Sequence, residues 1–163
     1  MLTATLWVAL GVIGAALIAR GVKISEFRQL WIDEIRNDIS EYISKAHEWI
    51  DIYLAFNKET ALEEKQKMMP KLDRLKYEAL HIHSRICLRF KPNDEKANKL
   101  LEHLLYLLDP SKLVTEKGDM YLSWREISDN AVLEARFLLK EEWEHTKNPL
   151  KKIFNKLKKL LHE

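Results

Sequence analysis

Few residues in this 163-residue chain can cross-link it or interrupt its helices. There is a single cysteine, Cys87, so no disulfide can form within the chain, which fits a reducing compartment. There are four glycines and four prolines, and no proline occurs before Pro70. Because turns and helix ends depend largely on these two residue types, the composition predicts long helices and an all-α fold.

The sequence also lacks a recognisable catalytic or metal-binding motif. It has no phosphate-binding glycine loop, dinucleotide fingerprint, nucleophile elbow or zinc-ligand spacing. His81 and His83 lie two residues apart, which places them on different faces of a helix. Cys87 lies in an apolar helical stretch and is expected to pack rather than react. We therefore predict that the protein is not an enzyme and uses no metal or cofactor.

Ionisable side chains are missing from the N-terminal run Leu2–Ala19. At about 1.5 Å per residue this run spans about 27 Å, close to the thickness of the hydrocarbon core of a bilayer. Arg20 and Lys23 follow the run and no basic residue precedes it, which places the rest of the chain in the cytoplasm. A cleaved signal peptide is the competing interpretation. We predict a transmembrane anchor over residues 1–22 and a cytoplasmic helical domain over residues 23–163.

Small residues are frequent in this run, and three of them lie near one face of the expected helix. They are Ala4, Gly11 and Ala15. In lipid, small side chains let two helices approach closely and gain dispersion contacts. These residues predict a contact surface between copies in a homo-oligomer, the oligomer seam. The plainer alternative is that alanine and glycine are generally common in membrane helices.

Apolar residues recur at spacings of three and four through the cytoplasmic part and predict a bundle of helices. The first helix continues directly from the anchor to about Asn57. Thr60 and Glu63 have the form of a capping box that opens a short helix ending at Met69. Pro70 is then expected in the first turn of the next helix, since proline is tolerated there.

Three further helices are separated by prolines. Pro92 and Pro110 mark the breaks between them, and Asn93 or Asp94 is the expected N-cap of the second. The helices are expected over residues 70–90, 94–108 and 120–146.

Charge is distributed unevenly although the formal net charge is only +2. Residues 24–56 and 93–146 are acidic, whereas residues 57–92 and 147–163 are basic. The last of these combines leucines with lysines and predicts a basic amphipathic helix over residues 149–162. Such a helix suits an anionic lipid surface, and docking on the core with the lysines in water is the alternative.

A row of basic side chains follows the helix after Pro70 and could track a phosphate backbone. The members that we take as candidate ligand contacts are Lys71, Arg74, His81, Arg85 and Arg89. A second set near the membrane offers arginines for phosphates and Trp31 as a stacking surface for a base. That set is Arg28, Gln29, Trp31 and Arg36. The plainer explanation of the basic row is a helix face exposed to water. The plainer explanation of Trp31 is packing in the core.

The stretch directly after the anchor, Ile24–Ile39 with the sequence ISEFRQLWIDEIRNDI, resembles small single-pass bacterial membrane proteins of anti-phage defence, nearest the Hailong-type membrane effectors. The resemblance covers about 40 N-terminal residues and the overall helical design. It implies an oligomeric ion channel that a bound single-stranded DNA oligomer holds closed. It also implies a place in the bacterial inner membrane and ligand contacts at Arg28, Gln29, Trp31 and Arg36.

Together these features predict a membrane-anchored homo-oligomer that binds an anionic ligand and depolarises the membrane when it rearranges. A single-stranded DNA oligomer or another nucleotide is the candidate ligand. The alternative is a non-enzymatic adaptor, tethered to the membrane, that positions a partner protein and has neither ligand nor conductance.

Overall fold

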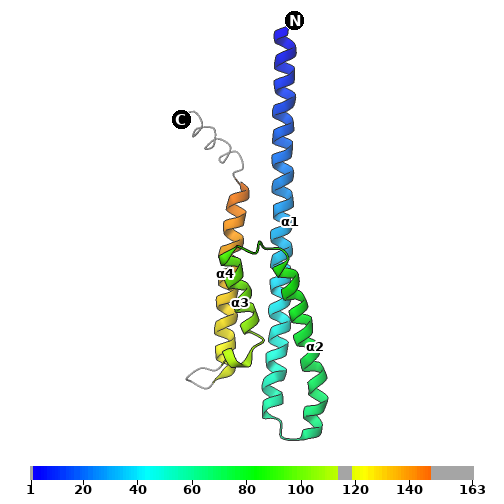
Figure 1. Cartoon of the computed structure of the whole chain (residues 1–163), viewed down its shortest axis with the longest axis vertical. Helices are drawn as coiled ribbons and strands as arrows, with labels where there is room; N and C mark the ends of the chain where they lie inside the picture. Colours follow the sequence, from blue (N-terminus) through cyan, green and yellow to red (C-terminus); the bar gives the residue numbers. More distant parts are fainter. Residues whose placement is uncertain (1, 114–118, 148–163) are drawn as a thin grey trace. The chain divides into compact units, whose positions relative to one another are not determined.

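The computed structural model describes residues 2–113 and 119–147, and the expected helix at 149–162 lies outside these residues. No strand occurs within the two described ranges, so the all-α fold is confirmed. The elements in chain order are α1 (Leu2–Lys58), α2 (Leu62–Cys87), α3 (Glu95–Tyr106), the short 3-10 turn η1 (Pro110–Lys112) and α4 (Met120–Lys147) (Figure 1).

The chain divides into two compact units. The first unit contains Met1–Asp33 and Leu139–Glu163, and the second contains Glu34–Leu138. Both α1 and α4 contribute residues to each unit. The two units are described separately below.

In the first unit, α1 presents an apolar surface that no other described residue covers. The helix has no proline to interrupt it and runs without a break to Lys58, one residue past the expected end at Asn57. By length and composition it is able to cross a membrane, and none of its apolar window is buried. In residues 5–19, the large apolar side chains that are more than half exposed are Leu6, Trp7, Val8, Leu10, Val12, Ile13, Leu17 and Ile18.

In the second unit, α1 becomes amphipathic and supplies one wall of a helical core. Two buried hydrogen bonds connect α1 and α4 to the α3 region. The hydroxyl of Tyr42 in α1 donates to the carbonyl oxygen of Leu104 in α3 at 2.6 Å, and Nε1 of Trp124 in α4 donates to that of Leu107 at 3.1 Å. The most deeply buried large side chains are Ile35, Tyr42, Trp49, Ile50, Ile86, Leu100, Leu104, Leu107 and Leu113.

The expected helix break between Met69 and Pro70 is wrong. Instead, α2 runs continuously from Leu62 to Cys87 with Pro70 inside it. A proline in a helix interior lacks a hydrogen-bond donor and costs about 3 kcal/mol. Tertiary packing of the residues that follow, such as Leu75 and Ile82, outweighs this local cost.

The capping box at Thr60 and Glu63 does not form either. The N-cap residue of α2 is Ala61, which makes no side-chain cap. Oε1 of Glu59 instead accepts hydrogen bonds from the backbone N–H groups of Ala61 and Thr60, both at 2.8 Å, and these bonds lower the pKa of Glu59. The carboxylate of Glu59 therefore orders the turn before α2, and no side chain caps the helix itself.

Most of the later boundaries agree with the sequence, although α2 ends at Cys87 and α3 at Tyr106, three and two residues before the expected ends at 90 and 108. The side chain of Asp94 accepts a hydrogen bond of 3.0 Å from the N–H of Ala97, which confirms it as the N-cap of α3. The side chain of Asp109 accepts from the N–H of Ser111 at 3.0 Å and stabilises the expected turn. The helix expected over residues 120–146 is α4, which ends one residue later.

Candidate functional site

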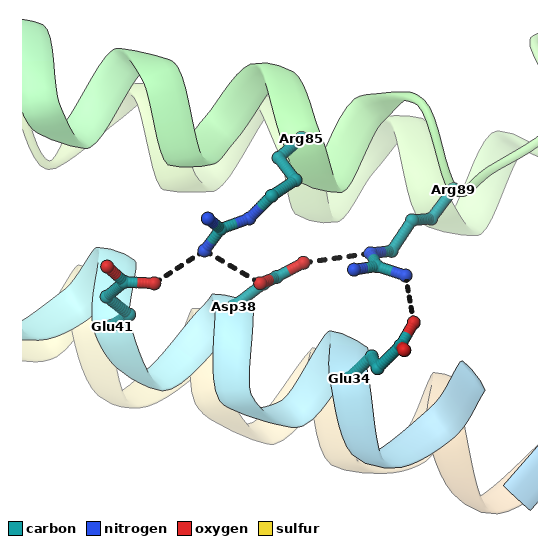
Figure 2. Close-up of polar contacts among 5 residues, drawn as sticks. All are labelled: Glu34, Asp38, Glu41, Arg85 and Arg89. Carbon is teal, nitrogen blue, oxygen red and sulfur yellow. Dashed lines mark hydrogen bonds and ion pairs between the residues drawn. The ribbon is translucent and has the colours of Figure 1, made fainter. Parts of the chain in front are cut away.

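Five charged side chains join α1 to α2 in the second unit (Figure 2). Glu34, Asp38 and Glu41 of α1 lie four and three residues apart, and Arg85 and Arg89 of α2 lie four apart. These spacings put each set on one face of its helix. The five residues alternate in sign in the order Glu41, Arg85, Asp38, Arg89, Glu34, and we call them the α1–α2 ladder.

Asp38 is the centre of the ladder. Its Oδ1 lies 2.8 Å from Nη2 of Arg85, and its Oδ2 accepts a hydrogen bond of 2.8 Å from Nε of Arg89. Nη1 of Arg89 also donates to Oε2 of Glu34 at 2.6 Å, and Nη2 of Arg85 donates to Glu41. The side chain of Asp38 is 9% exposed, against 60% for Glu34 and 51% for Glu41. The inner carboxylate is therefore desolvated, whereas the outer two remain at the surface.

The ladder holds both guanidinium groups in their charged form. The hydrogen bond to Glu41 raises the pKa of Arg85, and Asp38 adds to this rise. Burial lowers the pKa of Arg89, but the hydrogen bonds to Glu34 and Asp38 outweigh it and the pKa is raised overall. With three carboxylates and two guanidinium groups, the ionised ladder has one negative charge in excess. An anionic ligand would therefore have to displace a carboxylate to reach Arg85 or Arg89.

The rest of the predicted basic row lies on the surface of α2. Lys71 and His81 are exposed. Nε of Arg74 donates to Oε1 of Glu78 at 2.7 Å, and Oε2 of Glu78 lies 2.9 Å from Nζ of Lys45 in α1. The row therefore divides into an exposed half, which is Lys71, Arg74 and His81, and two arginines in the ladder.

The candidate contacts near the membrane are less uniform than the sequence pattern. Arg28 and Gln29 are exposed in the first unit, and Nη1 of Arg28 lies 4.0 Å from Oε2 of Glu142 in α4. Trp31 is half-buried there, while Arg36 is exposed in the second unit. These four residues thus do not form one exposed set.

The three residues of the expected oligomer seam all belong to α1. Gly11 and Ala15 are exposed, and a Cβ atom added at Gly11 would meet no heavy atom within 4 Å. Nothing in the described part of the chain covers this face.

No protein-family model, curated protein or solved structure matches this chain. Function is therefore inferred from its own residues and contacts.

The carboxylates of the ladder were missed at the level of sequence. Glu34, Asp38 and Glu41 all lie in the acidic segment 24–56, and nothing in the sequence alone pairs them with Arg85 or Arg89. The signal that could have found them is the shared four-residue spacing of Glu34 and Asp38 in α1 and of Arg85 and Arg89 in α2.

His83 and Cys87 lie together in α2. Nε2 of the buried His83 is 2.9 Å from the carbonyl oxygen of Leu101, and Sγ of Cys87 is 3.5 Å from Nδ1 of His83. Burial raises the pKa of the Cys87 thiol, which disfavours the reactive thiolate. Within the described ranges, no group of three or more histidine, cysteine or acidic side chains could hold a metal ion.

A second polar cluster joins α3 to α4. Oε2 of Glu134 lies 2.7 Å from Nδ1 of His103, and its Oε1 lies 2.8 Å from Nζ of Lys99. Partial burial raises the pKa of Glu134, but the hydrogen bonds from Lys99 and His103 outweigh it and lower the pKa below its ordinary value. The ionised carboxylate of Glu134 therefore stabilises the contact between α3 and α4.

We expect Glu134→Gln to flatten the acid dependence of stability. Because the pKa of Glu134 is lower in the folded than in the unfolded state, its ionised carboxylate stabilises the fold at neutral pH. This contribution is lost below about pH 4.5, as the pH falls from the unfolded-state pKa through the folded-state pKa. Urea unfolding of the full chain in detergent at several pH values from neutral to acidic measures the effect. Glu126→Gln, at an exposed carboxylate of the same helix, is the control. Identical acid curves for wild type and Glu134→Gln would contradict the assignment.

Proposed function

We propose that this chain is a membrane-anchored effector of bacterial anti-phage defence that works as a homo-oligomer and depolarises the membrane. The observation that supports this proposal best is the nature of α1. This single 57-residue helix exposes large apolar side chains over its first part and joins a folded helical core over its last part. An apolar surface of this extent is stable in lipid or against other apolar helices. Arg20 and Lys23 follow the apolar run, which favours an anchor in the inner membrane with the C-terminal domain in the cytoplasm.

Control by a ligand would act through α1. The helix that carries the apolar run also carries the three carboxylates of the ladder. A ligand that alters the ion pairs between α1 and α2 would therefore act on the same helix that crosses the membrane. A ligand that binds one arrangement of the assembly more tightly by a few kcal/mol is sufficient for such control. The exposed half of the basic row, Lys71, Arg74 and His81, is the accessible place for the phosphates of a single-stranded DNA oligomer or another nucleotide.

We expect replacement of the seam by bulky residues to abolish depolarisation. In the double variant Gly11→Leu and Ala15→Leu, the added side chains prevent close approach of two helices in lipid. Cells that express the full chain should then keep their membrane potential, measured with a potential-sensitive dye. The purified protein should also lose mass in mild detergent relative to wild type.

The matched control is the double variant Ala9→Leu and Ala16→Leu. These alanines lie seven residues apart on a different face of α1, so the same kind of substitution should leave the oligomer intact. Equal loss in both double variants would point to a general effect on insertion. A wild-type protein that is monomeric in mild detergent and harmless on expression would overturn the proposed function.

We expect the double variant Lys71→Gln and Arg74→Gln to bind nucleic acid with a weaker salt dependence. Each contact with a phosphate of a single strand contributes about 0.7 to the slope of log affinity against log salt, so losing two contacts lowers the slope by about 1.4. Binding of a fluorescent single-stranded DNA oligomer across a salt series measures this slope. The control is Arg136→Gln with Lys140→Gln, which removes two exposed charges from α4. An unchanged slope would exclude the basic row as the ligand site.

The adaptor hypothesis is supported by exposed apolar side chains in the second unit. Tyr77 of α2 is 73% exposed, Leu88 directly after α2 is 88% exposed, and Phe137 of α4 is 65% exposed. Large apolar groups on a folded surface are common in protein interfaces. An adaptor has no conductance, so wild-type expression would then leave the dye signal unchanged, whereas the effector would dissipate the potential.

A further inference from the structure

The helices α2 and α4 lie on opposite sides of the core of the second unit. Helix α2 contacts α1 through the ladder, and it contacts α3 where Nε2 of His83 lies 2.9 Å from the carbonyl oxygen of Leu101. Helix α4 contacts the same two helices, because Nε2 of His47 in α1 lies 2.9 Å from the hydroxyl oxygen of Tyr121, and Glu134 binds His103 of α3. Since α1 and α3 both lie between them, the outer faces of α2 and α4 point away from each other (Figure 1).

The outer face of α2 carries two strongly exposed apolar side chains that lie eleven residues apart. Tyr77 is 73% exposed, and Leu88, directly after the helix, is 88% exposed. Eleven residues make about three helical turns, so the two side chains share one face and lie about 16.5 Å apart along the axis. His81 lies between them on this face, is exposed, and can donate a hydrogen bond.

The outer face of α4 has the same spacing with the complementary polar group. Leu122 is 59% exposed and Leu133 is 46% exposed, and they too lie eleven residues apart. The exposed Glu126 follows Leu122 by four residues, just as His81 follows Tyr77 by four residues. A carboxylate accepts the hydrogen bond that an imidazole N–H donates. The two faces of this one chain therefore complement each other in spacing and in polar chemistry.

The two faces also begin at the same level of the bundle. Oε2 of Glu78 in α2 lies 2.9 Å from Nζ of Lys45 in α1, and the hydroxyl oxygen of Tyr121 in α4 lies 2.9 Å from Nε2 of His47. Both contacts fall within one turn of α1. Within the second unit, α2 and α4 run in the same direction, opposite to that of α1 (Figure 1). Two copies side by side, in one orientation, can therefore place the α2 face of one against the α4 face of the other in matching register.

We propose that the outer face of α2 in one copy packs against the outer face of α4 in the next copy, which joins copies of this chain head to tail. The pairs, α2 residue first, are Tyr77 with Leu122, His81 with Glu126 and Leu88 with Leu133. Such a contact keeps every copy in the same orientation, as a shared membrane requires, and closes into a ring if the rotation between copies permits.

This inference rests on the homo-oligomer of the proposed function and adds the surface that joins the copies outside the membrane. It places His81 between copies, so that Lys71 and Arg74 remain for an anionic ligand. It also gives Tyr77 and Leu88 a second copy as their partner in place of a different protein.

Cross-linking between two cysteine variants of the full chain tests the contact. In a Cys87→Ser background, one protein carries Tyr77→Cys and the other carries Leu122→Cys, each with its own tag. The two are co-expressed, purified in mild detergent and treated with a short bismaleimide. We expect a cross-linked dimer that contains both tags, and none from either protein alone. Arg136→Cys in place of Leu122→Cys is the control, because it is exposed on α4 about 21 Å further along the axis and should give no dimer.

Charge variants at the central pair give a second test. His81→Glu in the Tyr77→Cys protein places two carboxylates opposite each other and should lower the yield of mixed dimer about tenfold. Glu126→Lys in the Leu122→Cys protein should restore the yield when both changes are combined, because it returns opposite charges to the pair. A yield that is insensitive to His81→Glu, or that Glu126→Lys does not restore, would contradict the pairing.

The other outcomes separate this contact from the proposed function. An oligomer of unchanged mass without the mixed dimer would overturn the contact and leave the proposed function in place. Dimers from Tyr77→Cys alone or Leu122→Cys alone would also overturn it, because like faces would then meet. Cross-linking of Tyr77→Cys only to a different protein would assign the α2 face to the partner of an adaptor. A wild-type protein that is monomeric in mild detergent would overturn the homo-oligomer itself.

Discussion

We expect Trp49→Ala to lower the free energy of unfolding by about 3–5 kcal/mol, the usual cost of removing a large buried aromatic side chain. Trp49 is 2% exposed, and its ring stacks on that of Tyr53 with centroids 5.1 Å apart and planes 17° from parallel. The substitution leaves a cavity in the second unit that the neighbouring side chains fill only in part. Urea unfolding of the full chain in detergent, followed by circular dichroism, measures the loss.

Trp49→Phe is the matched control for this prediction. Nε1 of Trp49 has no hydrogen-bond partner in the described part of the chain, so phenylalanine removes no hydrogen bond. It keeps a ring for Tyr53 and loses only part of the volume, for which we expect a cost of about 1 kcal/mol. If both substitutions cost the same, the buried volume of the indole is not what stabilises this region.

Helix positions in this chain could be predicted because they depend on local chemistry. Apolar residues at spacings of three and four indicate the face of α1 that the second unit buries, which includes Tyr42 and Trp49. The scarcity of proline and glycine predicted long helices, and α1 and α4 end within one residue of the positions expected. Asp94 could be recognised as a cap because its side chain bonds to a backbone group three residues away.

The failures depend on contacts between helices, which spacing alone does not contain. Pro70 was expected to start a helix because the sequence shows its local cost but not the packing that compensates it. Charge alone likewise predicts the basic row as one ligand-binding surface. Sequence shows that Arg85 and Arg89 share a face, but their carboxylate partners lie 44 to 55 residues away in the chain. Only the pairing of α1 with α2 reveals them.

We expect Asp38→Ala to lower the free energy of unfolding by about 2–3 kcal/mol. Removing one partner from a desolvated ion pair leaves the other charge uncompensated, which often costs about 3–5 kcal/mol. Here the loss is smaller because Arg85 keeps Glu41 and Arg89 keeps Glu34. Glu41→Ala is the control at an exposed end of the ladder and should cost less than about 1 kcal/mol. Urea unfolding of the three proteins in the same detergent compares them directly.

Asp38→Asn separates charge from shape at the same position and connects the ladder to function. The amide fills the same space but leaves the two guanidinium groups with two carboxylates in place of three, so the excess negative charge disappears. An anionic ligand should then reach Arg85 and Arg89 more easily, and binding of single-stranded DNA should strengthen while the oligomer mass stays constant. If Asp38→Ala costs no more than Glu41→Ala and Asp38→Asn leaves DNA binding unchanged, the ladder neither stabilises the α1–α2 contact nor guards the two arginines.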